Sequence, residues 1–426
     1  MRVTNKMLSN NFLSDMQINL NNMKILQQQM SSGKEIRKPS DDPFKVSRTM
    51  QLNTDINTNK QYNENIKDTI NWLSTTDTAI GQAENSLQRV KELLTQAGNA
   101  GYSVSERKAI KDEINQRISE LSQIMNTNFD GKYIFGGTRS TAKPMDTKTV
   151  YTLPASVTQS NEKGGAAAVS GTFSTQPDKN HTYMVKVTGV NPLTPGEASK
   201  VQLSVDGGAY GADINVASGK FALGSDAFNL NFEVGTNTAN KSGDVYTFTL
   251  NSNTKLDYDF DKDAHPADSL KQVQTKLVTE ISQGVTMEYN VSASDMLEYK
   301  SGSETKNLKD LLSNIVNHLD GMKADGSAAD SDAVNKLTNE DMGEMKDAID
   351  SLLTLRSEVG AKQNRMESAQ SKNTDENYNM TDVLSKTEDI DITQKTMEYA
   401  TMQTVYLASL QTSSKVLQPS LMDYLR

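Results

Sequence analysis

Apolar residues recur at alternating spacings of three and four near both ends of the chain, and this periodicity constrains the fold most. Near the N-terminus the stripe runs through Phe12, Met16, Asn19, Met23, Leu26 and Met30, and further on through Ile80, Ala83, Leu87, Val90, Leu94 and Ala97. Near the C-terminus it runs through Ile349, Leu352, Arg356, Val359, Gln363 and Met366, and then through Tyr399, Met402, Tyr406, Leu410 and Leu417. Such spacing places side chains on one helix face and predicts long helices that pack as in a coiled coil.

Local signals predict where the N-terminal helices begin and end. The first helix should cover residues 5–32, because Gly33 is suited to the left-handed residue that follows a helix. Asp42 precedes Pro43, as an N-cap residue precedes proline at the first helical position. A second helix should therefore run from residue 43 to about residue 97.

The middle of the chain has a different period. Residues 183–190, 200–208, 228–235 and 245–250 alternate apolar with polar side chains between Gly, Asn and Asp clusters, which predicts antiparallel strands with one wetted face. We therefore expect an α+β fold. An N-terminal helical region (1–145) and a C-terminal helical region (301–426) pair as a bundle around a central β-rich, outward-facing domain (146–300).

Composition narrows the possible functions. The net charge is −10 and cysteine is absent, which argues against a nucleic-acid footprint and excludes disulfides and thiolate metal sites. Counted with Gly and without Tyr, the apolar share is about 38%, below the roughly 45–50% of ordinary globular chains. Some apolar surface is therefore expected to need another subunit to cover it.

The sequence shows neither a membrane-spanning segment nor a secretory signal. No run approaches 18 apolar residues, so no membrane insertion is expected. The first residues, MRVTNKMLSNNF, lack the apolar stretch of a secretory signal. A chain of this kind that leaves the cell is expected to use another route.

Motifs that carry chemistry are scarce. His181, His265 and His318 are scattered, and no zinc-protease, P-loop or nucleophile-elbow sequence occurs. Gly136-Gly137 is typical of a turn, because no lysine or G-x-G-x-x-G pattern surrounds it. We therefore expect no enzyme activity and no cofactor.

Alternating carboxylates at residues 257–263 resemble the start of a calcium loop. However, Lys262 stands where such a loop needs glycine, and Asp268 replaces its bidentate Glu. The alternative is a strand end with Tyr258 and Phe260 facing inward and the Asp side chains in solvent. The sequence leaves both interpretations open and favours the strand end.

Four segments carry a family resemblance. MSSGKEIRKPSDDPFKVSRTM (30–50) strongly resembles the bacterial flagellin family, and SEVGAKQNRMESA (357–369) resembles its first long C-terminal helix. NTNFDGKYIFGGTRSTAKPM (126–145), with a strand expected at Tyr133–Phe135, is similar to the hook–filament junction members of that family. The tail ASLQTSSKVLQPSLMDYLR (408–426) resembles the ending of the same members.

The resemblance implies a structural adaptor that joins hook to filament and is exported unfolded through the flagellar type III apparatus. It implies an extracellular position in the flagellum, with hook-associated protein 1 and flagellin as neighbours, self-association, and an export chaperone for the C-terminal helices. It also implies that the terminal helices form the inner tube. We expect bundle and assembly contacts at Phe12, Met16, Met23, Leu26, Met30, Tyr399, Met402, Tyr406, Leu410 and Leu417.

Two rival functions stay open. Filament flagellin itself would share both terminal regions, although the 126–145 segment and the tail speak against it. A surface adhesin or glycan-binding module would instead use residues 145–300, although no aromatic cluster there supports it and Trp72, the single tryptophan, lies in a helical region.

Overall fold

The structure is a computed structural model. It describes residues 5–36, 38–98, 104–154, 157–159, 167–173, 179–190, 198–215, 220–222, 228–234, 241–260, 265–326 and 330–416. The expectations for Leu417 and for Asp261 to Asp263 lie outside these residues.

The chain divides into two compact units. Unit 1 comprises Met1–Lys67, Glu280–Val285 and Ser368–Arg426, and unit 2 comprises Asp68–Thr279 and Thr286–Glu367. Each unit therefore combines segments from both halves of the sequence. The three-part division at residues 145 and 300 stays a prediction about sequence segments.

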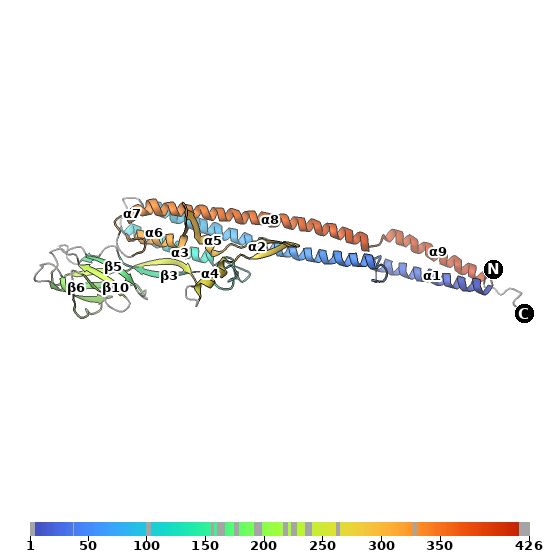
Figure 1. Ribbon diagram of the computed structural model, residues 1–426, viewed down its shortest axis with the longest axis horizontal. Helices are drawn as coiled ribbons and strands as arrows, with labels where there is room; N and C mark the ends of the chain where they lie inside the picture. Colours follow the sequence, from blue (N-terminus) through green and yellow to red (C-terminus); the bar gives the residue numbers. More distant parts are fainter. Residues whose placement is uncertain are drawn as a thin grey trace, which may run out of the picture. The chain divides into compact units, whose positions relative to one another are not determined.

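The long helices form where the periodicity predicts them. They are α1 (Asn5–Ser32), α2 (Pro43–Ala97), α8 (Met342–Glu388) and α9 (Ile392–Val416), which Figure 1 labels. Gly33 follows α1 with φ at +71°, and Asp42 Oδ1 accepts hydrogen bonds from the amides of Phe44 and Lys45 at 3.1 and 3.0 Å. Both predicted signals are confirmed, because they satisfy backbone groups that a helix end leaves unpaired.

Unit 2 holds shorter helices besides its parts of α2 and α8. These are α3 (Val104–Met125), α4 (Pro266–Gln274), α5 (Ala293–Leu297), α6 (Leu308–Leu319), α7 (Ala333–Lys336) and a π-helical turn at Leu337–Asp341. The α2 stripe from Ile80 to Ala97 is fully buried here, as are Ile349, Leu352, Val359 and Met366 of α8. These two stripes therefore pack within the chain itself.

All strand pairs with a described register are antiparallel, as the alternating pattern predicts. A five-stranded sheet has the order β4-β11-β6-β7-β8 and a three-stranded sheet the order β5-β10-β9, while β12-β3, β1-β2, β13-β14 and β15-β16 form two-stranded pairs. The strands are β1 (Asn128–Phe129), β2 (Lys132–Tyr133), β3 (Met145–Thr152), β4 (Thr158–Gln159), β5 (Ala167–Phe173), β6 (Thr182–Val190), β7 (Ala198–Val205), β8 (Ile214–Asn215), β9 (Lys220–Ala222), β10 (Phe228–Val234), β11 (Val245–Thr249), β12 (Asn251–Tyr258), β13 (Val278–Ser282), β14 (Val285–Glu288), β15 (Glu298–Ser301) and β16 (Glu304–Asn307).

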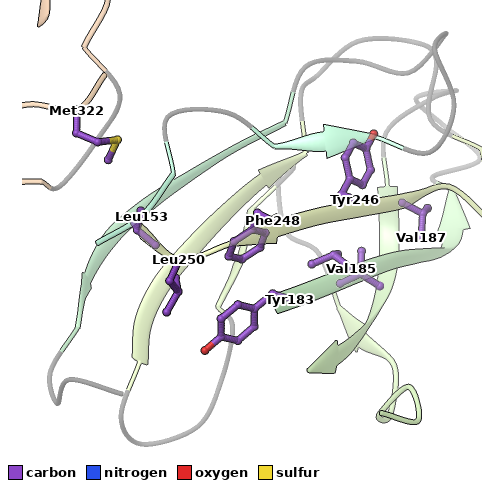
Figure 2. Packing of buried hydrophobic residues seen from close by; sticks show 9 residues of the cluster. Leu153, Tyr183, Val185, Val187, Tyr246, Phe248, Leu250 and Met322 are labelled. Carbon is purple, nitrogen blue, oxygen red and sulfur yellow. The ribbon is translucent and has the colours of Figure 1, made fainter. Parts of the chain in front are cut away.

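The five-stranded sheet buries its aromatic residues. Tyr183 and Phe248 are register partners and stack with ring centroids 5.1 Å apart, and Figure 2 shows Leu250 beside them. Tyr246 and Val185 are completely buried in the same cluster. These aromatic side chains stabilise the core of the sheet and do not form an exposed binding platform.

A buried ion pair connects α3 to the end of α6. Lys111 Nζ donates to Asp320 Oδ1 at 2.7 Å and to Asn253 Oδ1 on β12 at 3.2 Å. Burial raises the pKa of Asp320, and the charge of Lys111 partly opposes that rise. Removing one partner of such a pair is costly, because the other charge stays buried alone.

The predicted strand at Tyr133–Phe135 is wrong beyond its first residue. Strand β2 ends at Tyr133, and the chain then turns, because the amide of Gly136 donates to Tyr133 O at 3.2 Å. Ile134 and Phe135 are nonetheless completely buried. Their apolar character fits burial in a turn as well as it fits a strand, so their sequence could not separate the two.

Gly137 is required by both conformation and space. Its φ is +58°, and a Cβ placed there would lie 2.3 Å from Val273 O and 2.4 Å from Gln272 O. These carbonyls belong to the backbone of α4 and cannot rotate away. The Gly-Gly turn therefore lets residues 136–139 pack closely against α4.

We predict that Gly137→Ala lowers the free energy of unfolding by at least about 2 kcal/mol more than Gly131→Ala. Both positions have positive φ, but no atom lies within 4 Å of a Cβ at Gly131, so the difference isolates the clash with α4. Urea denaturation of both variants measures it. Equal losses would show that conformation alone, and not close packing, requires glycine at position 137.

Candidate assembly surface on the terminal helices

Helices α1 and α9, which we call the terminal pair, lie side by side in unit 1 and run in opposite directions (Figure 1). Their contact brings together residues that are more than 350 positions apart in the sequence. The α+β fold with paired terminal helices, predicted from the stripes, is confirmed.

The predicted contact residues lie mostly along the inner side of this pair. Leu26 is buried, and Phe12, Met16, Met23, Met30, Tyr399, Met402 and Tyr406 are half-buried. Leu410 is exposed, at 41% of its maximal area. Their role in assembly stays a prediction, because the structure contains one copy of the chain.

The outer sides of both helices carry further apolar residues. More than half of the large exposed apolar side chains among the described residues belong to the terminal pair: Met7, Leu13, Ile18, Leu20 and Ile25 on α1, and Ile392, Met397, Val405, Leu407 and Leu410 on α9. Exposed apolar patches are typical of surfaces that interact with another molecule, so the outer side of the terminal pair is a candidate interaction surface.

A groove of about 500 Å³ opens on the terminal pair. Leu26 of α1 lines it together with Gln394, Met397, Glu398, Thr401 and Met402 of α9. Lys395 donates to Glu398 Oε2 at 3.0 Å, and this hydrogen bond lowers the pKa of Glu398. Three apolar and three polar side chains therefore line the groove, and one of the polar ones is the anchored carboxylate of Glu398.

A backbone clamp holds the two helix breaks of unit 1 together. We use this name for residues 33–35, after α1, and residues 388–390, which begin at the last residue of α8 and lead toward α9. Lys34 and Asp389 form an antiparallel bridge, the amide of Glu35 donates to Glu388 O at 2.6 Å, and the amide of Ile390 donates to Gly33 O at 3.1 Å. The C-terminal end of α1 and the C-terminal end of α8 therefore lie side by side.

Side chains reinforce the clamp. Lys34 Nζ donates to Asp389 Oδ1 at 2.7 Å, and Ser385 donates to Asp389 Oδ2 at 2.6 Å. The hydrogen bond from Lys34, followed by that from Ser385, lowers the pKa of Asp389, and the same bond to Asp389 raises the pKa of Lys34. Both side chains are about two-fifths exposed, so solvent screens the pair and its stabilisation is small.

The stripes did not reveal the break between α8 and α9, although the sequence contains a signal for it. Asp391 Oδ1 accepts from the amides of Thr393 and Gln394 at 2.9 and 3.1 Å, which caps the start of α9. An Asp followed three residues later by Gln is typical of a helix N-terminus. Attention to caps as well as periodicity would have placed this break.

Buried amides connect α2 and α8 within unit 1. Asn59 Nδ2 donates to Asn373 O at 2.9 Å, and Asn373 Nδ2 donates to Ile281 O at 2.8 Å. Because both amides are shielded from water, their bonds specify how the two helices and residues 280–285 fit together.

The acidic run at residues 257–263 begins as a strand end, with Tyr258 and Phe260 buried as expected. The expectation that Asp257 is solvated is wrong, because it is buried between Lys148 and Lys309 at 3.2 and 3.3 Å. Across the part of the chain that the structure describes, no cluster of three or more His, Cys, Asp or Glu residues could hold a metal ion.

The histidines lie in separate places. His318 pairs with Asp341 at 2.6 Å in a buried site, and His181 pairs with Asp206 at 2.8 Å near the surface. His265 precedes α4.

Among the described helices, none is long and apolar enough to cross a bilayer.

These features define a protein in which long helices from the two ends of the sequence pair, with a β-rich region between them in the sequence. The model of the bacterial flagellin N-terminal helical region matches residues 3–140, and that of the C-terminal helical region matches residues 342–425. The two matches together cover more than half of the sequence. The chain therefore belongs to the bacterial flagellin family, whose members are structural components of the flagellum.

Individual relatives agree with this assignment. A flagellin of Clostridium tyrobutyricum is 23% identical over 414 residues, which are 94% of each chain. The flagellar filament 41 kDa core protein of Borreliella burgdorferi is 35% identical over 107 residues, which are 25% of this chain and 32% of that one. This second match spans less than half of the relative.

Solved structures of flagellar proteins also align with the chain. A putative flagellar hook-associated protein of Vibrio parahaemolyticus aligns over 82% of this chain and 100% of its own, with a TM-score of 0.44 and 13% identity. FlgL of Bacillus cereus aligns over 79% of this chain and 99% of its own, with a TM-score of 0.38 and 14% identity.

We predict that Asp389→Asn speeds amide exchange at Glu35 and Ile390 by up to about fivefold at neutral pH, because an exposed ion pair contributes at most about 1 kcal/mol. Hydrogen exchange read by NMR or mass spectrometry measures this. Asp382→Asn is the matched control, since Asp382 pairs with Lys386 outside the clamp.

The difference in amide exchange rate between the wild type and Asp389→Asn depends on pH. The folded pKa of Asp389 is lowered, so its contribution is present above the unfolded value of about 3.9 and is lost as the pH falls through the folded pKa. The exchange rates of the wild type and Asp389→Asn should therefore converge in acid. Identical rates at neutral pH would contradict a stabilising ion pair.

Proposed function

We propose that this chain is the adaptor that joins hook to filament in the bacterial flagellum, the role of hook-associated protein 3. It acts by assembly rather than by catalysis, and it needs no cofactor. Its place is outside the cell, with hook-associated protein 1 on one side, flagellin on the other, and copies of itself at the same level. An export chaperone and the flagellar type III apparatus bring it there unfolded.

The observation that carries this proposal is the exposed apolar surface of the terminal pair. Ordering and burying these side chains against neighbours stabilises the assembled form, since whatever binds only the folded chain shifts it toward that form. Nine of the ten predicted contact residues belong to this surface or to the stripe beneath it, and the tenth, Leu417, lies outside the described residues.

The position at the junction is supported by the two segments that resemble junction proteins. Residues 126–145 form a closed unit, because Asn126 Nδ2 donates to Met145 O at 2.7 Å and the amide of Met145 donates to Asn126 Oδ1 at 3.1 Å. Gly137 lies inside this unit against α4. The segment that resembles junction proteins, residues 126–145, thus forms a defined local structure.

Filament flagellin is the second candidate. The Clostridium tyrobutyricum relative carries that name and aligns with nearly the whole chain. A filament subunit would use the same terminal pair, so the contact residues cannot separate the two functions. The separation must come from where the protein accumulates and from what its loss leaves behind.

Deletion of the gene tests the proposal. Bare hooks on the cells, with unassembled flagellin in the medium, are the expected result, because flagellin would be exported without a platform. Bare hooks with no major filament protein in cells or medium would identify this chain as the flagellin. Normal filaments would contradict both functions.

We predict that Leu410→Asp abolishes filaments in complemented deletion cells while the exported variant is recovered from the medium. In the proposed assembly, Leu410 is buried against a neighbouring subunit. Loss of this burial, worth about 1.5–3 kcal/mol, weakens the contact between two subunits by roughly tenfold or more. Electron microscopy of cells and immunoblots of medium measure this.

Leu353→Asp is the matched control, because Leu353 is exposed to the same extent, 42% against 41%, but lies on α8 in unit 2. It should leave assembly intact. Normal filaments with both Leu26→Asp and Leu410→Asp in one chain would overturn the assignment of the contact residues.

A further inference from the structure

Methionines are distributed unequally between the two units. The chain has 19 methionines and no cysteine, so the thioether is its only readily oxidised sulfur group. Most described methionines of unit 2 are buried, with Met125, Met145, Met322, Met345 and Met366 completely so. Among the described methionines of unit 1 none is buried, and Met7, Met50 and Met397 are 55%, 62% and 61% exposed.

The terminal pair contains most of these accessible thioethers. Met16, Met23 and Met30 repeat every seven residues along α1, so they occupy the same face in successive turns of the stripe. Met397 and Met402 of α9 line the groove together with Leu26. Sulfur atoms therefore lie both beside and within the surface that the proposed function uses for assembly.

We propose that the thioethers of the terminal pair, first Met7 and Met397, are an oxidation site at which peroxide blocks assembly of the chain. In this step the sulfur lone pair attacks one peroxide oxygen, an S–O bond forms and the O–O bond breaks. The sulfide is oxidised to a sulfoxide by two electrons, and hydrogen peroxide is reduced to water. The consequence for assembly rests on the proposed function; the order of oxidation does not.

The physical effect follows from the change in polarity. A methionine side chain is flexible and apolar and adapts to irregular contact surfaces, whereas a sulfoxide carries a polar oxygen. Burying that oxygen without a hydrogen-bond donor is unfavourable. Oxidation thus removes apolar contact from the terminal pair, while the buried methionines of unit 2 keep its core unchanged.

The first experiment treats the purified full-length chain with limiting hydrogen peroxide and follows each methionine by peptide mass spectrometry. We expect Met7, Met50 and Met397 to be oxidised at least about tenfold faster than Met345 and Met366, because oxidation follows exposure. Equal rates at exposed and buried positions would overturn the proposal whatever the chain does in the cell.

The second experiment uses deletion cells in which the chain is induced during exposure to hydrogen peroxide. Met7→Leu with Met397→Leu keeps apolar volume and removes the reactive sulfur, so the share of its filaments that survives exposure, relative to unexposed cells with the same variant, should be several-fold higher than for the wild type. Met50→Leu is the matched control, since Met50 is equally exposed but lies on α2 outside the terminal pair, and it should stay as sensitive as the wild type.

The outcomes separate the two proposals. Equal filament loss in the double variant and in Met50→Leu would overturn the oxidation site as a block on assembly. Absence of filaments in unexposed cells that express the wild type would contradict the proposed function instead. In that case the order of oxidation in the purified chain still decides whether the exposed methionines, Met7 and Met397 among them, react before the buried methionines of unit 2.

Discussion

The packing of helices from opposite ends of the sequence is the interaction on which both compact units depend. In unit 2 the stripes of α2 and α8 are buried together, and Arg356 Nε donates to Asp77 Oδ1 at 2.9 Å beside them. In unit 1, a hydrogen bond from Asn59 to Asn373 joins the same two helices. In the same unit, α1 and α9 pack together as the terminal pair. Because closing a longer loop costs little more entropy than closing a shorter one, a β-rich region can lie between the partners without preventing their association.

The shortage of apolar residues explains why the two units differ. Unit 2 has enough apolar side chains to bury the α2 stripe completely, together with the core of its five-stranded sheet. The terminal pair has two helices only, and two helices cannot cover the apolar residues that face away from their seam. Its stripe therefore stays half-buried and its outer side stays exposed. Stability in this part of the chain must come from contacts with other molecules or remain low.

Sequence reasoning succeeded where one local signal had one structural meaning. The end of α1 and the start of α2 followed from Gly33 and Asp42-Pro43, since these residues satisfy backbone groups at helix ends. It failed where the same residues serve two structures. Ile134 and Phe135 are apolar in a turn as in a strand, and the charge of Asp257 gave no sign of the two lysines that other segments bring to it. The contact of Lys34 with Asp389 is likewise invisible in sequence, because it depends on the pairing of whole helices.

The methionines of the terminal pair suit the adaptor role proposed above. A protein between two different helical arrays must fit two contact geometries with one surface. Flexible, unbranched methionine can repack against either, whereas β-branched residues hold one shape. The regular placement of Met16, Met23 and Met30 therefore has a physical use in the proposed role. The same choice makes the surface reactive, because the feature that lets a thioether adapt, its polarisable sulfur, also makes it the group that an oxidant attacks first.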